Sequence, residues 1–319
     1  ARSTQELVVI CGCRRFVSVR RAGAQVLCDL ALDDALSHVN YNPLDVDPTG
    51  RLAAFVTKQQ SVVSVRDVRT GEELHALSLA LERFPGQQER ASPFLGGVRF
   101  VSSDGSLLAV WGSFGAAVFD VATESVVHRL VHRGDQDVNG CVMHGPLLCV
   151  ACDAGATNQS RVAVETAKTE SGFLMAVEGA SVVDTRSGKL VQALGEATLG
   201  TCSNGCAFDR SGKRLAVGQG KSNSAMAADV TAEVIIYDVS VDEDGARCVE
   251  ATRMAVPGQE SAPSSLQWSP DEHFLLVAAN EGSGQGFAIL NVEDGKVPFW
   301  FQVFAAVELD VNVANYING

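Results

Sequence analysis

Short apolar runs alternate with polar turns along nearly the whole chain, and the same arrangement returns several times. Each copy opens with a polar turn and continues into an apolar strand. Runs of β-branched residues bounded by Gly, Pro, Asp and Ser predict strands rather than helices. The opening turns are 47–50, 103–105, 209–212 and 269–272, and the strands after them are Leu52 to Val56, Leu107 to Trp111, Leu215 to Gly218 and Phe274 to Ala278.

A second strand in each copy ends in an acidic or amide residue, and a further turn and a last strand follow it. A repeat of about forty to sixty residues is typical of the blades of a β-propeller, or of another repeat array. The pattern therefore predicts an all-β propeller of four-stranded antiparallel blades. These strands, each of which follows the apolar strand of its copy, end at Asp67, Asp120, Asp184, Asp238 and Asn291.

The spacing predicts five complete blades, at about 38–79, 97–131, 138–194, 205–256 and 264–304. Before them, residues 7–10, 16–20 and 26–32 predict three strands that lack a first strand. The alternating run from Val307 to Val313 predicts a strand that would supply it. Pairing the two chain ends would close the ring and remove its exposed sheet edges. We expect one domain over residues 1–319 with six blades, or seven if the chain continues beyond either end.

The polar turns and the Asp-ended strands resemble the repeats of WD40-like propellers, from about Leu7 to Val313. The chain departs from the consensus of that family, because no Gly-His pair opens a repeat and no Trp-Asp pair closes one. Arg66, Phe119 and Val183 stand where the tryptophan would be. The resemblance implies a rigid platform for protein partners and leaves the subfamily open, since fold alone does not fix function.

Composition narrows the classes of partner. The formal charge of −13 argues against general binding of nucleic acid and against docking on anionic lipid. No stretch approaches the roughly twenty apolar residues of a membrane span. The nine cysteines are irregularly spaced, and Cys28, Cys149 and Cys152 lie in apolar runs. They predict reduced core thiols, and therefore a chain of the cytoplasm or the nucleus.

Three long segments depart from the repeat, at 81–96, 154–179 and 220–232. The first segment joins two blades, and the other two each join the second and third strands of a blade. In WD40-like propellers, both kinds of connection emerge on the same face of the ring. Binding residues concentrate in loops on rigid scaffolds, although surface loops also lengthen at little energetic cost. In a second interpretation, Phe173 and Met175 form an extra strand on their own blade. The expected partner-binding residues are Arg83, Phe84, Arg161, Phe173, Met175 and Lys221.

No motif predicts a catalytic residue, a cofactor or a metal. The run Gly218 to Ser222 resembles the end of a phosphate-binding loop, but Leu215 replaces a required glycine and no helix is expected after it. Cys149 and Cys152 have zinc-like spacing, but residues three apart on a strand point to opposite faces. We therefore expect these cysteines in the core.

The sequence favours a non-catalytic scaffold that binds other proteins within a multi-subunit complex, without direct contact to nucleic acid or insertion into a membrane. Two alternatives stay open. One is a propeller enzyme or small-molecule sensor, with convergent side chains at the mouth of the central channel. The other is a regulator of a small GTPase that reaches its partner with a long loop.

Overall fold

The structure of the chain is a computed structural model. It describes residues 7–12, 15–20, 25–31, 44–57, 61–79, 95–132, 138–152, 173–176, 179–187, 189–194, 201–221, 231–242, 245–257, 262–279 and 286–302. Every regular element in these ranges is a β-strand. Within the same ranges, no helix is present that has the length and apolar character to span a membrane.

The strands form one three-stranded sheet and five larger sheets. We number the larger sheets as blades 2 to 6, in chain order. The N-terminal sheet contains β1 (Leu7–Gly12), β2 (Arg15–Arg20) and β3 (Gln25–Ala31). Blade 2 contains β4 (Leu44–Val46), β5 (Leu52–Val56), β6 (Val62–Asp67) and β7 (Glu73–Ser78), and blade 3 contains β8 (Leu95–Phe100), β9 (Leu107–Gly112), β10 (Gly115–Asp120) and β11 (Ser125–His132).

The remaining blades follow the same order. Blade 4 contains β12 (Val138–His144), β13 (Leu147–Cys152), β15 (Ala180–Asp184) and β16 (Lys189–Leu194). Blade 5 contains β17 (Thr201–Phe208), β18 (Arg214–Lys221), β19 (Glu233–Asp242) and β20 (Gly245–Ala255). Blade 6 contains β21 (Ser265–Trp268), β22 (Phe274–Ala279), β23 (Gly286–Asn291) and β24 (Phe299–Gln302). A short additional strand, β14 (Phe173–Ala176), lies between β13 and β15 in the chain.

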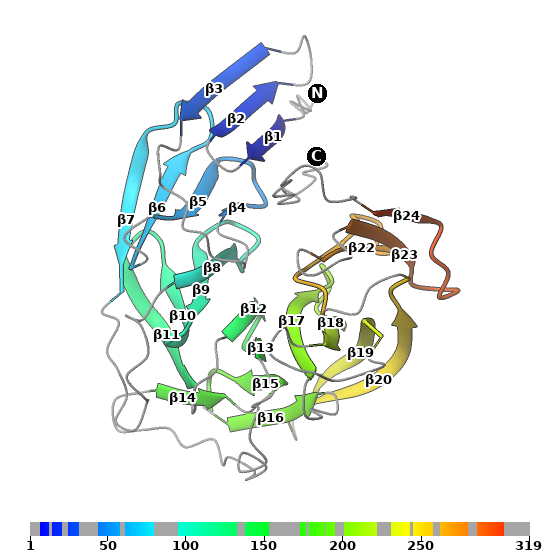
Figure 1. Cartoon of the computed structure of the whole chain (residues 1–319). Coiled ribbons are helices and arrows are strands. Elements are labelled where there is room, and N and C mark those ends of the chain that lie inside the picture. The colour runs from blue at the N-terminus through cyan, green and yellow to red at the C-terminus, as the bar shows by residue number, and fades with distance from the viewer. Residues whose placement is uncertain are drawn as a thin grey trace.

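Figure 1 shows the sheets arranged one after another around a central space, with the first strand of each blade innermost and the fourth outermost. Neighbouring strands within each blade are antiparallel, so successive connections alternate between two faces of the ring. We call the face with the first-to-second and third-to-fourth connections the turn face. The face with the second-to-third and blade-to-blade connections is the loop face.

Apolar side chains fill the spaces between successive blades. The middle strands of a blade are covered on both sides by its neighbours, which explains why their sequences are unbroken apolar runs. In β13, for example, Val150 packs toward blade 3 while Cys149 packs toward blade 5. The four clusters between blades contain Val65 and Phe119 (blades 2 and 3), Trp111 and Val150 (3 and 4), Cys149 and Ile235 (4 and 5), and Ile236 and Leu275 (5 and 6).

The described residues form five four-stranded blades and not the expected six. The N-terminal sheet has three strands there, and the segment expected to complete it, 307–313, lies outside the described residues. Closure of the ring by this segment therefore stays a prediction.

The strand β14 corrects a second expectation. It pairs in parallel with β11, so it extends the outer edge of blade 3 rather than its own blade 4. An outermost strand presents unpaired backbone N–H and C=O groups at its outer edge, and β14 covers this edge along residues 129–132.

Candidate functional site

The first-to-second turns of blades 2, 3, 5 and 6 are each capped by a side chain at their start. The backbone N–H five residues later donates to this cap: from Leu52 to Asp47 at 2.6 Å, from Leu107 to Ser102 at 2.8 Å, from Arg214 to Asp209 at 3.2 Å and from Phe274 to Ser269 at 2.9 Å. The repeated polar turn of the sequence is thus a self-contained hydrogen-bonded unit.

An Asp or Asn that ends the third strand of a blade caps the turn after it. Asp67 accepts from the N–H of Arg69 at 2.7 Å, and Asp120 accepts from that of Thr123 at 2.9 Å. Hydrogen bonds from Thr123 hold the pKa of Asp120 below its usual value, so this carboxylate stays ionised. Asp67 and Asp120 therefore stabilise the turns that follow them.

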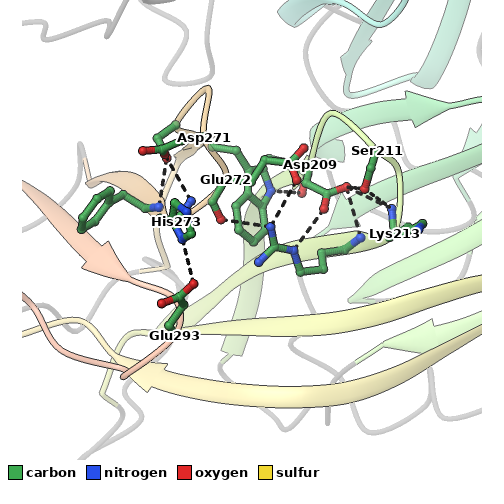
Figure 2. A network of polar contacts seen from close by, with 12 residues as sticks. Asp209, Ser211, Lys213, Asp271, Glu272, His273 and Glu293 are labelled. Carbon is green, nitrogen blue, oxygen red and sulfur yellow. Dashed lines mark hydrogen bonds and ion pairs between the residues drawn. The ribbon is translucent and has the colours of Figure 1, made fainter.

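Figure 2 shows a polar network that joins blade 5 to blade 6. Nε of Arg214 lies 3.1 Å from Oδ2 of Asp209, whose side chain is 1% exposed. Nη2 of Arg214 donates to the carbonyl oxygen of Glu272 at 3.0 Å. The same guanidinium lies 4.6 Å from the ring centroid of Trp268, a cation–π contact. Arg214 thus fixes the turns of two blades against each other.

Two turns place a glutamate where equivalent turns place glycine. Glu124 and Glu272 have φ values of 55° and 62°, in the left-handed region, which costs a non-glycine residue about 1 kcal/mol. Each glutamate contacts the preceding blade. Oε1 of Glu124 lies 3.1 Å from Nδ1 of His75, and Oε2 of Glu272 lies 3.5 Å from Nη2 of Arg214. The strained positions are therefore those that join one blade to the next.

One arginine crosses the centre of the ring. Arg99 lies in β8, and its Nη1 donates to the carbonyl oxygen of Cys206 in β17 at 2.7 Å. Its Nη2 donates to the carbonyl oxygen of Leu266 in β21 at 3.3 Å. A single guanidinium therefore links the innermost strands of blades 3, 5 and 6.

Other polar groups of the innermost strands also bond between blades. Nδ2 of Asn139 donates to Oδ1 of Asn204 at 2.8 Å, and Nδ2 of Asn204 donates to the carbonyl oxygen of Ala262 at 3.2 Å. Oδ2 of Asp45 accepts from the N–H of Phe100 at 2.7 Å. The polar side chains near the axis hold blades 2 to 6 together.

Six cysteines are buried free thiols: Cys28, Cys141, Cys149, Cys152, Cys206 and Cys248. A hydrogen bond with the Cys206 thiol and burial both raise the pKa of Cys149, and burial raises the pKa of Cys248 to about 11. Because the thiolate is the reactive form, these side chains are core groups rather than nucleophiles. This confirms the core position expected for Cys28, Cys149 and Cys152. In the part of the chain that the structure describes, no group of three His, Cys, Asp or Glu could hold a metal ion.

The long segments do connect strand ends on one face. Segments 79–94, 153–179 and 222–232 leave β7, β13 and β18 and lead to β8, β15 and β19, so their ends lie on the loop face. Of the six expected partner-binding residues, Phe173 and Met175 lie in β14 and Lys221 ends β18, whereas Arg83, Phe84 and Arg161 lie outside the described residues.

Sequence reasoning missed the Arg99 contact. The one signal was an arginine between Val98 and Phe100 in an otherwise apolar first strand. Its acceptors are carbonyl oxygens, one of them 107 positions away, and no local pattern identifies them.

No family model and no curated protein matches the chain. Solved structures do match. The β-propeller domain of Cps50 (Swd1) from Myceliophteria thermophila is 12% identical with a TM-score of 0.57, over 95% of this chain and 88% of that one. A chain of the mitotic checkpoint complex is 16% identical with a TM-score of 0.55, over 85% of this chain and 66% of that one, just under two thirds of its length.

A third similar structure is hydrazine synthase from Kuenenia stuttgartiensis, 15% identical with a TM-score of 0.53, over 87% of this chain and 70% of that one. At these identities the likeness concerns the fold alone, and one of the three proteins is an enzyme by its name. Together with the four-stranded antiparallel blades and the capped turns, these matches identify the fold of this chain as that of a WD40-like β-propeller.

Proposed function

We propose that this chain is a non-catalytic interaction scaffold, a subunit of a larger assembly that binds a protein partner through the loop face. Arg83, Phe84, Arg161, Phe173, Met175 and Lys221 are the proposed contact residues. We also propose that it works in the cytoplasm or the nucleus, without direct contact to nucleic acid. The strongly negative charge and the buried thiols support this setting.

The observation that carries the proposal is the difference between the two faces. On the turn face, the connections are short, as at 68–72 and 121–124, and their backbone groups are capped by their own side chains. On the loop face, the connections at 79–94, 153–179 and 222–232 are much longer. Long loops on a rigid scaffold are where binding residues concentrate.

One of the similar structures supports a role in an assembly, because it is described as part of the mitotic checkpoint complex. The similarity to hydrazine synthase is the one observation that favours the alternative function, an enzyme. The described innermost strands favour the scaffold, because Arg99, Asn139 and Asn204 bond to other blades instead of converging on a free site.

The test uses paired variants of the full chain. Replacing both Arg83 and Phe84 with alanine removes a proposed apolar anchor and its polar neighbour. Central anchors carry about 2 kcal/mol or more, so affinity for the native partner should fall about thirtyfold. Partners are first captured on the tagged wild-type chain and identified by mass spectrometry, and their affinities are then measured by calorimetry.

The matched control replaces Arg69 and Leu74, also an arginine and a large apolar residue, but exposed on the turn-face side of blade 2. It should keep full affinity. A second variant replaces 154–178 and 222–230 with short Gly-Ser links. If this variant has the circular dichroism spectrum of the wild type, and both it and the Arg83/Phe84 variant bind every partner unchanged, the loop face is not the working surface.

A further inference from the structure

The tetrapeptide Arg-Ser-Gly-Lys occurs twice on the turn face. It forms residues 186–189, between β15 and β16 of blade 4, and residues 210–213, between β17 and β18 of blade 5. The first is a third-to-fourth turn and the second a first-to-second turn, so the internal repeat of the propeller does not account for the match.

Equivalent turns elsewhere do not carry this pair of cations. The positions matching Arg186 and Lys189 hold Arg69 and Glu72, Ala122 and Ser125, and Glu293 and Lys296. The positions matching Arg210 and Lys213 hold Pro48 and Arg51, Ser103 and Ser106, and Pro270 and His273. Two cations in one turn thus occur only in blades 4 and 5, among the turns of blades 2 to 6 at these positions.

The two turns lie on either side of the β12–β13 turn. Thr185 donates from its backbone N–H at 2.8 Å and from its hydroxyl at 3.0 Å to the carbonyl oxygen of Pro146. On the other side, the ring of His144 packs against Gly212 so closely that a Cβ there would lie 2.0 Å from it. The two basic turns therefore belong to one continuous surface across blades 4 and 5.

In each of the two basic turns, the aspartate carboxylate accepts hydrogen bonds from its own turn, and the basic side chains are exposed. Asp209 is almost completely buried, and it accepts from the N–H of Lys213 and from Arg214, as Figure 2 shows. Asp184 is 15% exposed and bonded to Arg186, which is itself 64% exposed.

The other cations of these turns are free to meet a ligand. Lys189, Arg210 and Lys213 are all exposed. Among the residues that the structure describes, none of these three side chains has an acidic partner. We name the surface of Arg186, Lys189, Arg210 and Lys213 the basic patch.

The neighbouring surface limits the size of an anionic ligand. The corresponding turns of blade 6 expose Asp271, Glu293 and Asp294, and the pKa values of Asp271 and Asp294 are lowered by hydrogen bonds from Ser269 and Lys296. With the overall charge of −13, this surface repels a long polyanion. A short acidic segment would meet the basic patch without crossing the acidic turns.

We propose that the basic patch docks an acidic segment of a protein partner. Arginine and lysine bind carboxylate or phosphate groups through charge-assisted hydrogen bonds, and the hydroxyl of Ser187 adds a further donor. The negative groups are Asp or Glu side chains, or phosphorylated side chains, of an extended peptide. The patch lies on the opposite face from the proposed loop-face contacts, so this surface is additional to the proposed function and independent of it.

The test measures fluorescence anisotropy of short labelled peptides with the full chain at low salt. The patch variant changes Arg186, Arg210 and Lys213 to glutamine. The control variant changes Arg51, Arg69 and Lys296 to glutamine, which removes the same residue types and the same charge from the turn face of blades 2 and 6. Each variant also loses one ion pair, Arg186–Asp184 or Lys296–Asp294. Equal thermal stability of both variants shows that each is folded.

A Glu-rich peptide and a phosphoserine peptide should both bind the wild type, and their comparison shows which anion is preferred. The patch variant should bind about tenfold more weakly, from the loss of three exposed charge contacts, and the control should be within about twofold of the wild type. Binding should weaken with added salt, because exposed charges are screened. The proposal is overturned if neither peptide binds, if both variants lose equal affinity, or if single-stranded DNA of the same length binds as tightly.

Discussion

Alanine at position 140 should destabilise the propeller by about 3 kcal/mol or more, the upper range for overpacking. A Cβ on Gly140 would lie 2.2 Å from the carbonyl oxygen of Asn204. This obstacle is backbone in the neighbouring first strand, so no side-chain rotation relieves it. The neighbouring Asn139 also hydrogen-bonds to the Asn204 side chain, and separating the strands would strain this contact too. Thermal and urea unfolding followed by circular dichroism measure the effect.

The control for this substitution lies at the other end of the same strand. Gly145 follows β12, has φ of 54°, and has no atom within 4 Å of an added Cβ. Gly145→Ala should therefore lose only the cost of a left-handed alanine, about 1 kcal/mol. Equal losses for the two variants would mean that blades 4 and 5 do not approach as closely as this account requires.

The turns and the strands next to them could be predicted from the sequence because each turn contains its own cap. The expected strand from Leu52 to Val56 coincides with β5, and Asp67 and Asp120 end β6 and β10 as expected. A side chain that bonds to a backbone group within five residues leaves a local pattern. Such a pattern can be recognised without knowledge of the rest of the fold.

The strand β19 shows where local reasoning fails. It continues past the expected end at Asp238 to Asp242, because residues 239–242 pair with 245–248 of β20. This extended hairpin contacts blade 4, where the N–H of Cys248 donates to Oε1 of Gln192 at 3.1 Å. The residues that hold it in place lie in another blade, so its length could not be read from its own sequence.

The face on which the long connections lie could be predicted from the sequence, but the contacts of individual residues could not. The lengths of 79–94 and 222–232, together with the strand order, place long connections on one face. In contrast, β14 pairs with β11 of a different blade, and Arg99 bonds to carbonyl oxygens of distant strands. Carbonyl oxygens occur at every residue and carry no sequence signal, so contacts of this kind need the folded chain.

Deleting the chain from Glu308 onward should sharply lower thermal stability and solubility. The β1 strand lies at the edge of a three-stranded sheet, and its missing neighbour is expected at 307–313. Blade 6 also has an incompletely covered face, on which Leu276, Phe287 and Ile289 are half-buried and Phe299 is 46% exposed. Buried apolar side chains contribute about 1.5–3 kcal/mol each, so losing such a strand should remove more than about 5 kcal/mol.

Substitutions within the segment separate closure from a general effect of truncation. If 307–313 is a strand, Leu309 and Val311 share one face, and Glu308 and Asp310 share the other. Changing Leu309 and Val311 to asparagine should lower the melting temperature nearly as far as the deletion does. Changing Glu308 to glutamine and Asp310 to asparagine should change it little. If the chain truncated before Glu308 has the melting temperature of the wild type and stays soluble, this segment does not close the ring.

Hydrogen–deuterium exchange on the natively purified complex, compared with the free chain, tests the scaffold proposal most directly. Binding through the loop face predicts slower exchange in 80–94, 153–178 and 222–230 of the complex, with unchanged exchange in the turns 47–51 and 101–106 of blades 2 and 3. If those three segments exchange equally fast in both samples while other surfaces become protected, the loop face does not bind the partner.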